Sequence, residues 1–243
     1  MNKLRLYRTA VVIAAGLVGW AMPSHAQVTV NYTGGGTTTW TGPNPDFPIF
    51  SEKVDAGIYN GTVSGIPGAG PGMICDDYAD EVTPGETWKA TALNAASLTA
   101  GNVGNTMFGS LIGLDGYAEV ATLVSYMFSG KSGYTQAELS SAIWYITSGG
   151  SPLLSLELWS SMDKSAQALV TSLKSQFKTN AQALAALAGF GNLWILTPTK
   201  SGPQEMWVEA AEGGAAVLYL LLAGFSCFGA MYWKRRNLAG MTA

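Results

Sequence analysis

Hydrophobic and polar residues follow a strand-like pattern over the stretch from about residue 27 to residue 91. Short runs rich in β-branched and aromatic residues are separated by turns that contain glycine and proline, as is typical of short strands. The expected strands are Val28 to Tyr32, Thr37 to Trp40, Gly57 to Val63, Met73 to Tyr78 and Glu86 to Thr91. Between them, Ser64 to Gly72 holds four glycines and two prolines and is expected to be a loop.

From about Gly116 to Gly189 the pattern changes to a helical period, with apolar residues at i, i+3, i+4 and i+7. The expected helix starts are near Tyr117, at the capping box Thr135-Gln-Ala-Glu138, after Asp163 and at Asn180. Gly149-Gly150 is expected to end the second of these helices and Gly189 the last. This part of the chain is therefore predicted to be helical.

The last part before residue 209 returns to strand character, at Asn192 to Thr197 and Gln204 to Val208. The order strands, helices, strands predicts one α+β domain whose last strands pair back with the first group. Its six tryptophans are expected mainly in the core, because an indole ring buries a large apolar area. They are Trp40, Trp88, Trp144, Trp159, Trp194 and Trp207.

The first 26 residues have the composition of a secretory signal peptide. Three basic residues precede an apolar run from Ala10 to Met22, which is too short to span a bilayer comfortably. The small residues Ser24 and Ala26 predict cleavage between Ala26 and Gln27. Cleavage there removes the only histidine, His25, whereas an uncleaved anchor, the alternative, keeps it.

The C-terminal segment 210–243 is predicted to hold a membrane span. Residues 213–233 carry no charge and are long enough for a helix that crosses about 30 Å of hydrocarbon. A basic group, Lys234, Arg235 and Arg236, follows at once and is expected to stay in the cytoplasm, which leaves the domain outside. The alternative is a buried core helix, which would be expected to keep a polar stripe.

A short motif, one apolar span and a basic cluster at the C-terminus resemble the sorting signals of exosortase substrates (the PEP-CTERM class) or of the related rhombosortase class with a Gly-Gly motif. The motif position reads Glu212-Gly213-Gly214, and the Pro-Glu-Pro signature is absent. The resemblance implies processing of an exported bacterial protein by a sorting protease, exosortase-like or rhombosortase-like. A plain single-pass anchor meets the same physical rules and stays open.

Composition narrows the classes of function. Residues 27–209 hold seven lysines, no arginine and fifteen acidic residues, a formal charge of −8. Such a domain is repelled by phosphate, so we expect no nucleic-acid partner and no peripheral contact with anionic lipid. Without His25 the mature chain has no Ser-His-Asp or Cys-His pair and no His-containing zinc site. We therefore expect no enzyme, no metal and no cofactor.

One acidic cluster, Asp76, Asp77, Asp80 and Glu81, leaves a carboxylate-dependent hydrolase open, because glycosidases need only two acids. Acids adjacent in sequence rarely face each other across a sugar, and most such clusters are solvated turns. The cluster also lacks the spacing of an EF-hand calcium loop. It is therefore expected to be a solvated turn.

Cys75 is the only cysteine between residues 27 and 209, so it has no partner there for an internal disulfide. Its acidic neighbours Asp76 and Asp77 should raise the pKa of the thiol, which favours a small buried hydrophobic residue over a reactive thiolate. An intermolecular disulfide and a reactive thiol stay open.

The chain from about Gly57 to Thr147 nevertheless resembles thioester-forming adhesin domains and a group of PEP-CTERM-like exported proteins. The resemblance rests on Met73-Ile-Cys75-Asp76-Asp77, Gly85-Glu-Thr-Trp88, Tyr117-Ala-Glu119-Val-Ala121-Thr-Leu123 and Ala142-Ile143-Trp144. In thioester domains a cysteine is acylated by the glutamine of a Gln-x-Ala-Ile-Trp motif. Here Ser140 precedes Ser141-Ala-Ile-Trp, and the nearest glutamine is Gln136, one helical turn earlier. The resemblance thus implies a candidate thioester between Cys75 and Gln136.

The sequence as a whole predicts an exported bacterial surface protein, held by or processed at its C-terminal sorting segment. We expect a structural, matrix or binding role, with an exopolysaccharide, another surface partner or self-assembly as the partner. A covalent adhesin with a Cys75–Gln136 thioester is the first alternative, and a carboxylate-dependent hydrolase is the second.

Overall fold

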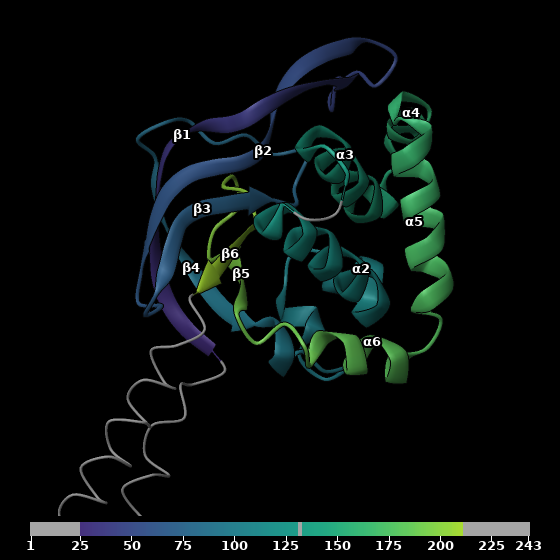
Figure 1. Ribbon diagram of the computed structural model, residues 1–243. Coiled ribbons are helices and arrows are strands. Elements are labelled where there is room, and N and C mark those ends of the chain that lie inside the picture. The colour runs from purple at the N-terminus through teal and green to yellow at the C-terminus, as the bar shows by residue number, and fades with distance from the viewer. Residues whose placement is uncertain (1–24, 131–132, 211–243) are drawn as a thin grey trace, which may run out of the picture.

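Six strands of the described chain form a closed antiparallel barrel, and helices cover one side of it (Figure 1). This computed structural model describes residues 25–130 and 133–210. The strands are β1 His25–Pro43, β2 Ser51–Ser64, β3 Ala69–Cys75, β4 Thr87–Asn94, β5 Leu193–Pro198 and β6 Met206–Ala210. Around the barrel they run β1-β2-β3-β6-β5-β4. The predicted return of the last strands to the first group is confirmed, since β6 pairs with β3 and β5 with β4.

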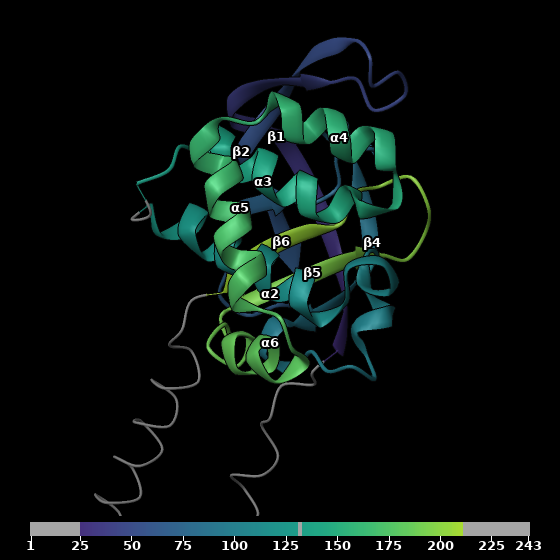
Figure 2. The same cartoon turned by 90° about the vertical axis from the view of Figure 1, so that its right-hand side faces the viewer.

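The helices come from the middle of the chain and pack in front of β5 and β6 when the molecule is viewed from the helical side (Figure 2). They are α2 Gly109–Ser129, α3 Gln136–Thr147, α4 Pro152–Ser161, α5 Lys164–Gln176 and α6 Asn180–Leu187. The capping box at the start of α3 is confirmed, because Thr135 and Glu138 bond each other's backbone N–H. The predicted α+β class is therefore confirmed.

Two predicted element boundaries were wrong because glycines that were expected to end or precede an element lie inside it. The runs Val28 to Tyr32 and Thr37 to Trp40 belong to one strand, β1, whose register shifts between Tyr32 and Thr38 without ending its pairing to β2. Helix α2 starts at Gly109 rather than near Tyr117. Gly113 lies inside it at φ 65° and ψ −168° and kinks the helix. The turns before the kink therefore do not share the helical period of the residues after it.

Other boundaries shifted by a few residues. Helix α4 was not predicted, because it buries only Leu154 and Leu158 and so shows little periodicity. The N-cap of α6 is Thr179 rather than Asn180, because Thr179 forms a capping box with Gln182. Strand β3 begins inside the stretch expected to be a loop, and it ends at Cys75 rather than at Tyr78.

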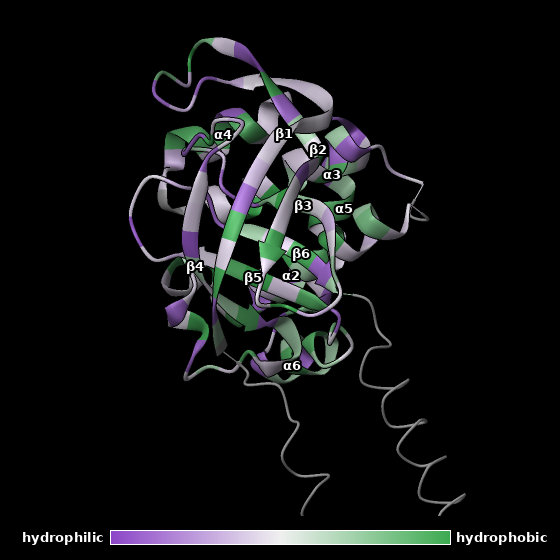
Figure 3. Cartoon of the chain, turned by 90° about the vertical axis from the view of Figure 1, so that its left-hand side faces the viewer, coloured by the Kyte–Doolittle hydropathy of each residue, from purple (hydrophilic) through white to green (hydrophobic). Residues whose placement is uncertain are grey.

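Alternation along the strands divides the apolar residues into two cores. Met73 and Cys75 point into the barrel interior, whereas Ile74, between them, packs in the core between barrel and helices. Along β4 exposed and buried residues also alternate, so the barrel face away from the helices carries both polar and apolar residues (Figure 3). Trp88, Trp144, Trp194 and Trp207 are buried, and Trp40 and Trp159 pack against the core, which confirms the core assignment of the tryptophans.

The first and last described residues, His25 and Ala210, lie at the same end of the barrel (Figure 1). The β1–β2 hairpin extends at the opposite end, where its turn exposes Phe47, Ile49 and Phe50. The predicted cleavage residues lie in the first part of β1, where Ala26 pairs with Ala92 and Gln27 with Thr91.

Candidate functional site

The segment 76–81, which leaves β3 and carries the acidic cluster, is fixed to three other parts of the fold. Gln204, just before β6, donates its side-chain amide to the backbone carbonyls of Asp77 and Asp80. Thr147 of α3 donates its hydroxyl to the Asp76 carbonyl over 2.6 Å, and the Tyr78 hydroxyl donates to the carbonyl of Pro43. The segment is therefore an anchored element of the barrel end.

The prediction that this cluster is a solvated turn was wrong for two of its four residues. Asp76 is fully buried and Asp77 is 3% exposed, while Glu81 is exposed and Asp80 half-buried. The reason is strand alternation: Asp76 continues the outward face of β3 beneath the helices, and Asp77 turns to the other side. Two acids that are adjacent in sequence thus enter different environments.

Asp77 has one satisfied and one unsatisfied carboxylate oxygen. Its Oδ1 accepts the backbone N–H groups of Ala79 at 3.0 Å and Asp80 at 3.3 Å, which forms a tight Asx turn. Its Oδ2 is buried and receives no hydrogen bond from any described residue. Burial, together with the charge of Asp80, raises the pKa of Asp77 to about 6. An unsatisfied buried acceptor of this kind is costly unless a donor reaches it.

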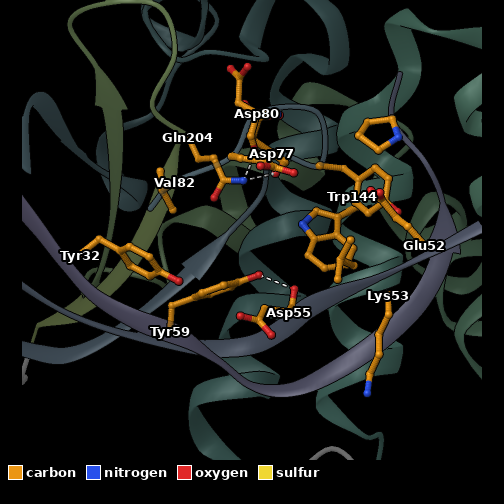
Figure 4. A pocket seen from close by; sticks show the side chains of 14 residues that line it. Tyr32, Glu52, Lys53, Asp55, Tyr59, Asp77, Asp80, Val82, Trp144 and Gln204 are labelled. Carbon is orange, nitrogen blue, oxygen red and sulfur yellow. Dashed lines mark hydrogen bonds between the residues drawn. The ribbon is translucent and has the colours of Figure 1, made fainter. Parts of the chain in front are cut away.

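Asp77 lines a cavity of about 350 Å³ at the end of the barrel, between the start of the β1–β2 hairpin and the segment 76–81 (Figure 4). We call it the barrel-end pocket. Its acidic lining residues are Glu52, Asp55, Asp77, Asp80 and Glu81. Its aromatic lining residues are Tyr32, Tyr59, Tyr78 and Trp144. A cavity of this size with a few convergent polar groups is typical of a small-molecule site.

The aromatic side chains of the pocket are held by contacts of their own. The rings of Tyr32 and Tyr59 lie 6.0 Å apart, and those of Tyr78 and Trp144 lie 5.0 Å apart. The Tyr59 hydroxyl donates to the backbone carbonyl of Asp55 over 2.6 Å. Burial raises the pKa of Tyr32, Tyr59 and Tyr78, so these hydroxyls stay neutral. The pocket therefore has a fixed aromatic wall and a charged rim.

Asp76 faces a second acid, Glu205, on the helical side of the barrel wall. Glu205 accepts hydrogen bonds from the Tyr117 hydroxyl at 2.5 Å, from the Met107 backbone N–H at 2.8 Å and from the hydroxyl of Thr197. Asp76 Oδ2 accepts the indole N–H of Trp207 at 2.6 Å. Both carboxyl groups are fully buried.

Burial and the Glu205 charge raise the pKa of Asp76 well above its usual value, so Asp76 carries the proton of the pair. Burial also raises the pKa of Glu205, against the three donors that stabilise its charged form. Asp76 Oδ1 receives no donor from the described residues, and a proton there becomes a donor toward Glu205. The pair is thus a neutral acid beside a buried carboxylate that accepts three hydrogen bonds from the protein.

The predicted thioester residues lie in different surroundings. Cys75 lies in the barrel interior, where its thiol donates to the Asp77 carbonyl at 2.9 Å and lies beside the Trp144 indole. Gln136 contacts Thr37 of β1, and Ser140 accepts the N–H of Gly57 in β2 at 2.9 Å.

Gln136 lies against Gly57 of β2 and bonds Thr37, whereas Cys75 bonds the Asp77 carbonyl, so the thioester between Cys75 and Gln136 stays a prediction. Burial, and then the charges of Asp77 and Asp76, raise the pKa of Cys75 well above its usual value. This agrees with the small buried hydrophobic residue that the sequence favours.

Sequence reasoning missed Asp55, Gln204 and Glu205 as residues of this region. Gln204 and Glu205 lie more than 120 residues from the segment that they bind, so no local spacing connects them. The only signal was the polar pair Gln204-Glu205 at the start of an otherwise apolar strand. Within the described ranges, no group of three or more histidine, cysteine or acidic residues is placed to hold a metal ion.

The sorting motif Glu212, Gly213 and Gly214, the apolar span 213–233 and the basic residues Lys234, Arg235 and Arg236 lie outside the described residues, as does the signal segment before His25. In residues 25–130 and 133–210, no helix is both long and apolar enough to cross a membrane. Comparison with known proteins adds no relative: no protein family, curated protein or solved structure matches this chain.

Proposed function

We propose that the protein is an exported, surface-held binding protein whose acidic domain takes a small polar group into the barrel-end pocket. One observation carries this proposal. Asp77, which lines the pocket, has a buried carboxylate oxygen, Oδ2, that no described residue satisfies, although the segment around it is anchored at several points. A fixed acceptor that lacks a donor beside a cavity is a group that a ligand can complete.

The placement of the chain ends supports a surface role. His25 and Ala210 lie at one end of the barrel (Figure 1). The pocket is lined by Pro45 and Glu52, beside the hairpin turn at the other end. A C-terminal span after residue 212 would therefore leave the domain with its pocket directed away from the membrane. The predicted signal peptide and sorting segment are consistent with this arrangement.

The binding half of the proposal can be tested with the exopolysaccharide washed from the producing cells. The full chain, kept in nonionic detergent, is compared with Val82→Trp, which places an indole in the pocket, and with Val63→Trp, a matched change outside its lining. We expect the native chain and Val63→Trp to bind the polysaccharide and Val82→Trp to lose most of the binding. Equal binding by all three would place the interaction elsewhere.

The export half has a separate test. Epitope tags placed after Gln27 and at the C-terminus are followed during export from cells. Loss of the C-terminal tag together with surface retention of the N-terminal tag supports processing at Glu212-Gly213-Gly214, and retention of both supports a plain anchor. A full-length protein that stays inside the cell would contradict the surface role.

A carboxylate-dependent hydrolase is the second candidate, and one observation favours it. Asp77, with its pKa raised to about 6, shares the pocket with Asp80, Glu81 and Asp55, so a proton donor and further carboxylates face one cavity. Release of reducing sugars from the same polysaccharide, lost in Asp77→Asn, would support hydrolysis. Binding of the polysaccharide without release of reducing sugars would contradict hydrolysis and support a binding protein.

A further inference from the structure

We infer that the barrel-end pocket recognises a protonated primary amine, which rests on the proposed binding function and names its ligand class. The first reason is the charge of the lining. The described lining holds five acidic residues and one lysine, Lys53. Figure 4 shows the Lys53 amine and the Asp80 carboxylate directed away from the other labelled side chains, which leaves more acidic than basic groups near the pocket. Anions are repelled by this lining, and a cation neutralises it.

The second reason is the unsatisfied oxygen of Asp77. Its Oδ1 is occupied by two backbone N–H groups, so Oδ2 is the acceptor left for a ligand. An ammonium group carries three N–H donors and no acceptor. One donor can complete Asp77 Oδ2, and the other two remain for solvent or for other acceptors at the rim. A charge-assisted bond of this kind is about twice as strong as a neutral one.

The aromatic wall favours an organic cation over a metal ion. Tyr32, Tyr59 and Trp144 surround the inner part of the pocket, and aromatic rings attract ammonium groups. A metal ion is disfavoured, because the described residues place no three ligand side chains together.

The amine can come from two sources, an amino sugar of a polysaccharide or a simple alkyl diamine. Isothermal titration calorimetry on the full chain in nonionic detergent, near neutral pH and at low salt, separates them with three probes. These are a glucosamine oligosaccharide, the same oligosaccharide fully N-acetylated, and 1,5-diaminopentane. We expect the first to bind and the acetylated form not to bind. Binding of the diamine as well would show that the amine alone suffices, and its failure would show that the sugar ring contributes.

Asp77→Asn removes the charge but keeps the oxygen that caps the turn, and it should weaken amine binding by about tenfold or more. Glu157→Gln on α4 makes the same change of net charge outside the pocket lining and should bind as the native chain does. If Asp77→Asn does not fold, the double variant Asp80→Asn, Glu81→Gln serves instead. It changes half-buried and exposed side chains and should weaken binding about threefold or more.

Three outcomes overturn the inference: no binding of either amine, equal binding of the acetylated oligosaccharide, or no effect of the pocket variants. The first is distinguishable from failure of the proposed function. If Val82→Trp loses exopolysaccharide binding but neither amine binds the native chain, the pocket is still the binding site. In that case the proposed function stands and only the inferred amine ligand is wrong.

Discussion

Asp76 and Asp77 are neighbours in sequence but lie in opposite kinds of site. Asp76 lies with Glu205 behind the barrel wall, where Tyr117, Trp207 and Met107 supply hydrogen bonds from within the fold. Asp77 lies on the pocket side, where Oδ2 lacks a protein donor among the described residues. The difference indicates that the first acid stabilises the fold and the second is available to a ligand.

Asp76 and Asp77 also show two ways in which the fold accommodates a buried carboxyl group. We call the Asp76–Glu205 pair closed because protein groups satisfy it: Asp76 is neutralised by a proton, and the negative charge of Glu205 is stabilised by three hydrogen-bond donors. Asp77 is only half satisfied, and its pKa of about 6 reflects burial with the repulsion of Asp80.

The largest effect is expected from Glu205→Ala. This change leaves the Tyr117 hydroxyl and the Met107 N–H without their acceptor and opens a cavity beneath α2, so unfolding free energy should fall by about 3–5 kcal/mol. Urea unfolding of the full chain in nonionic detergent, followed by tryptophan fluorescence, measures it. Glu205→Gln keeps the size and one acceptor and should lose about 1–2 kcal/mol. A loss below about 1 kcal/mol for Glu205→Ala would show that the pair does not stabilise the fold.

Cys75 should react as a buried thiol. Because it lies inside the barrel with a raised pKa, alkylation in the native chain should be at least about a hundredfold slower than in the unfolded chain. Unfolding alone should restore the reaction, and the intact mass should show no loss of ammonia. A mass lower by one ammonia, with a cysteine that reacts only after an amine has opened a bond, would instead establish the Cys75–Gln136 thioester.

Stability should fall as the pH rises from about 4 toward 7, which is the reverse of a protein held by salt bridges. The pKa of Asp77 is about 6 and that of Glu119 about 7 in the folded chain, because both are buried. Their unfolded values are about 3.9 and 4.3. Between these limits the folded chain holds a proton that the unfolded chain has lost, so each group lowers stability by about 1.4 kcal/mol per pH unit.

Asp76→Asn isolates the contribution of the closed pair. An asparagine amide can donate to Glu205 and its oxygen can accept from Trp207, so it resembles the protonated acid. The variant should have nearly native stability near pH 4 and should gain on the native chain as the pH rises, because it needs no proton. Unfolding curves at several pH values measure this. A constant difference between the two chains would show that Asp76 is not protonated in the fold.

Much of the barrel was predictable from local pattern, because strand alternation is local. Closure of the barrel was not predictable. It requires β1 to pair with β4, as Val30 does with Trp88, and that pairing is not local in sequence. The glycines at 34–36 also resembled the end of a strand, although β1 continues through them. Burial of Asp76 and Asp77 was not predictable either. It depends on Glu205 and Gln204, which reach the segment only after the chain has passed through all the helices. Sequence could locate the acids, whereas only the fold could separate their roles.

The smallest effect on stability is expected at the pocket rim. In the double variant Asp80→Asn, Glu81→Gln the side chains are half-buried and exposed, and Gln204 bonds the Asp80 backbone, which the change leaves in place. Unfolding free energy should therefore stay within about 0.5 kcal/mol of the native chain, with a slight gain because repulsion of Asp77 is relieved. The same urea titration used for Glu205→Ala measures it. If the rim variant were as unstable as Glu205→Ala, the rim acids would belong to the fold, and the distinction between a closed pair and an open pocket would fail. If it keeps its stability but loses ligand, the pocket acids are present for binding.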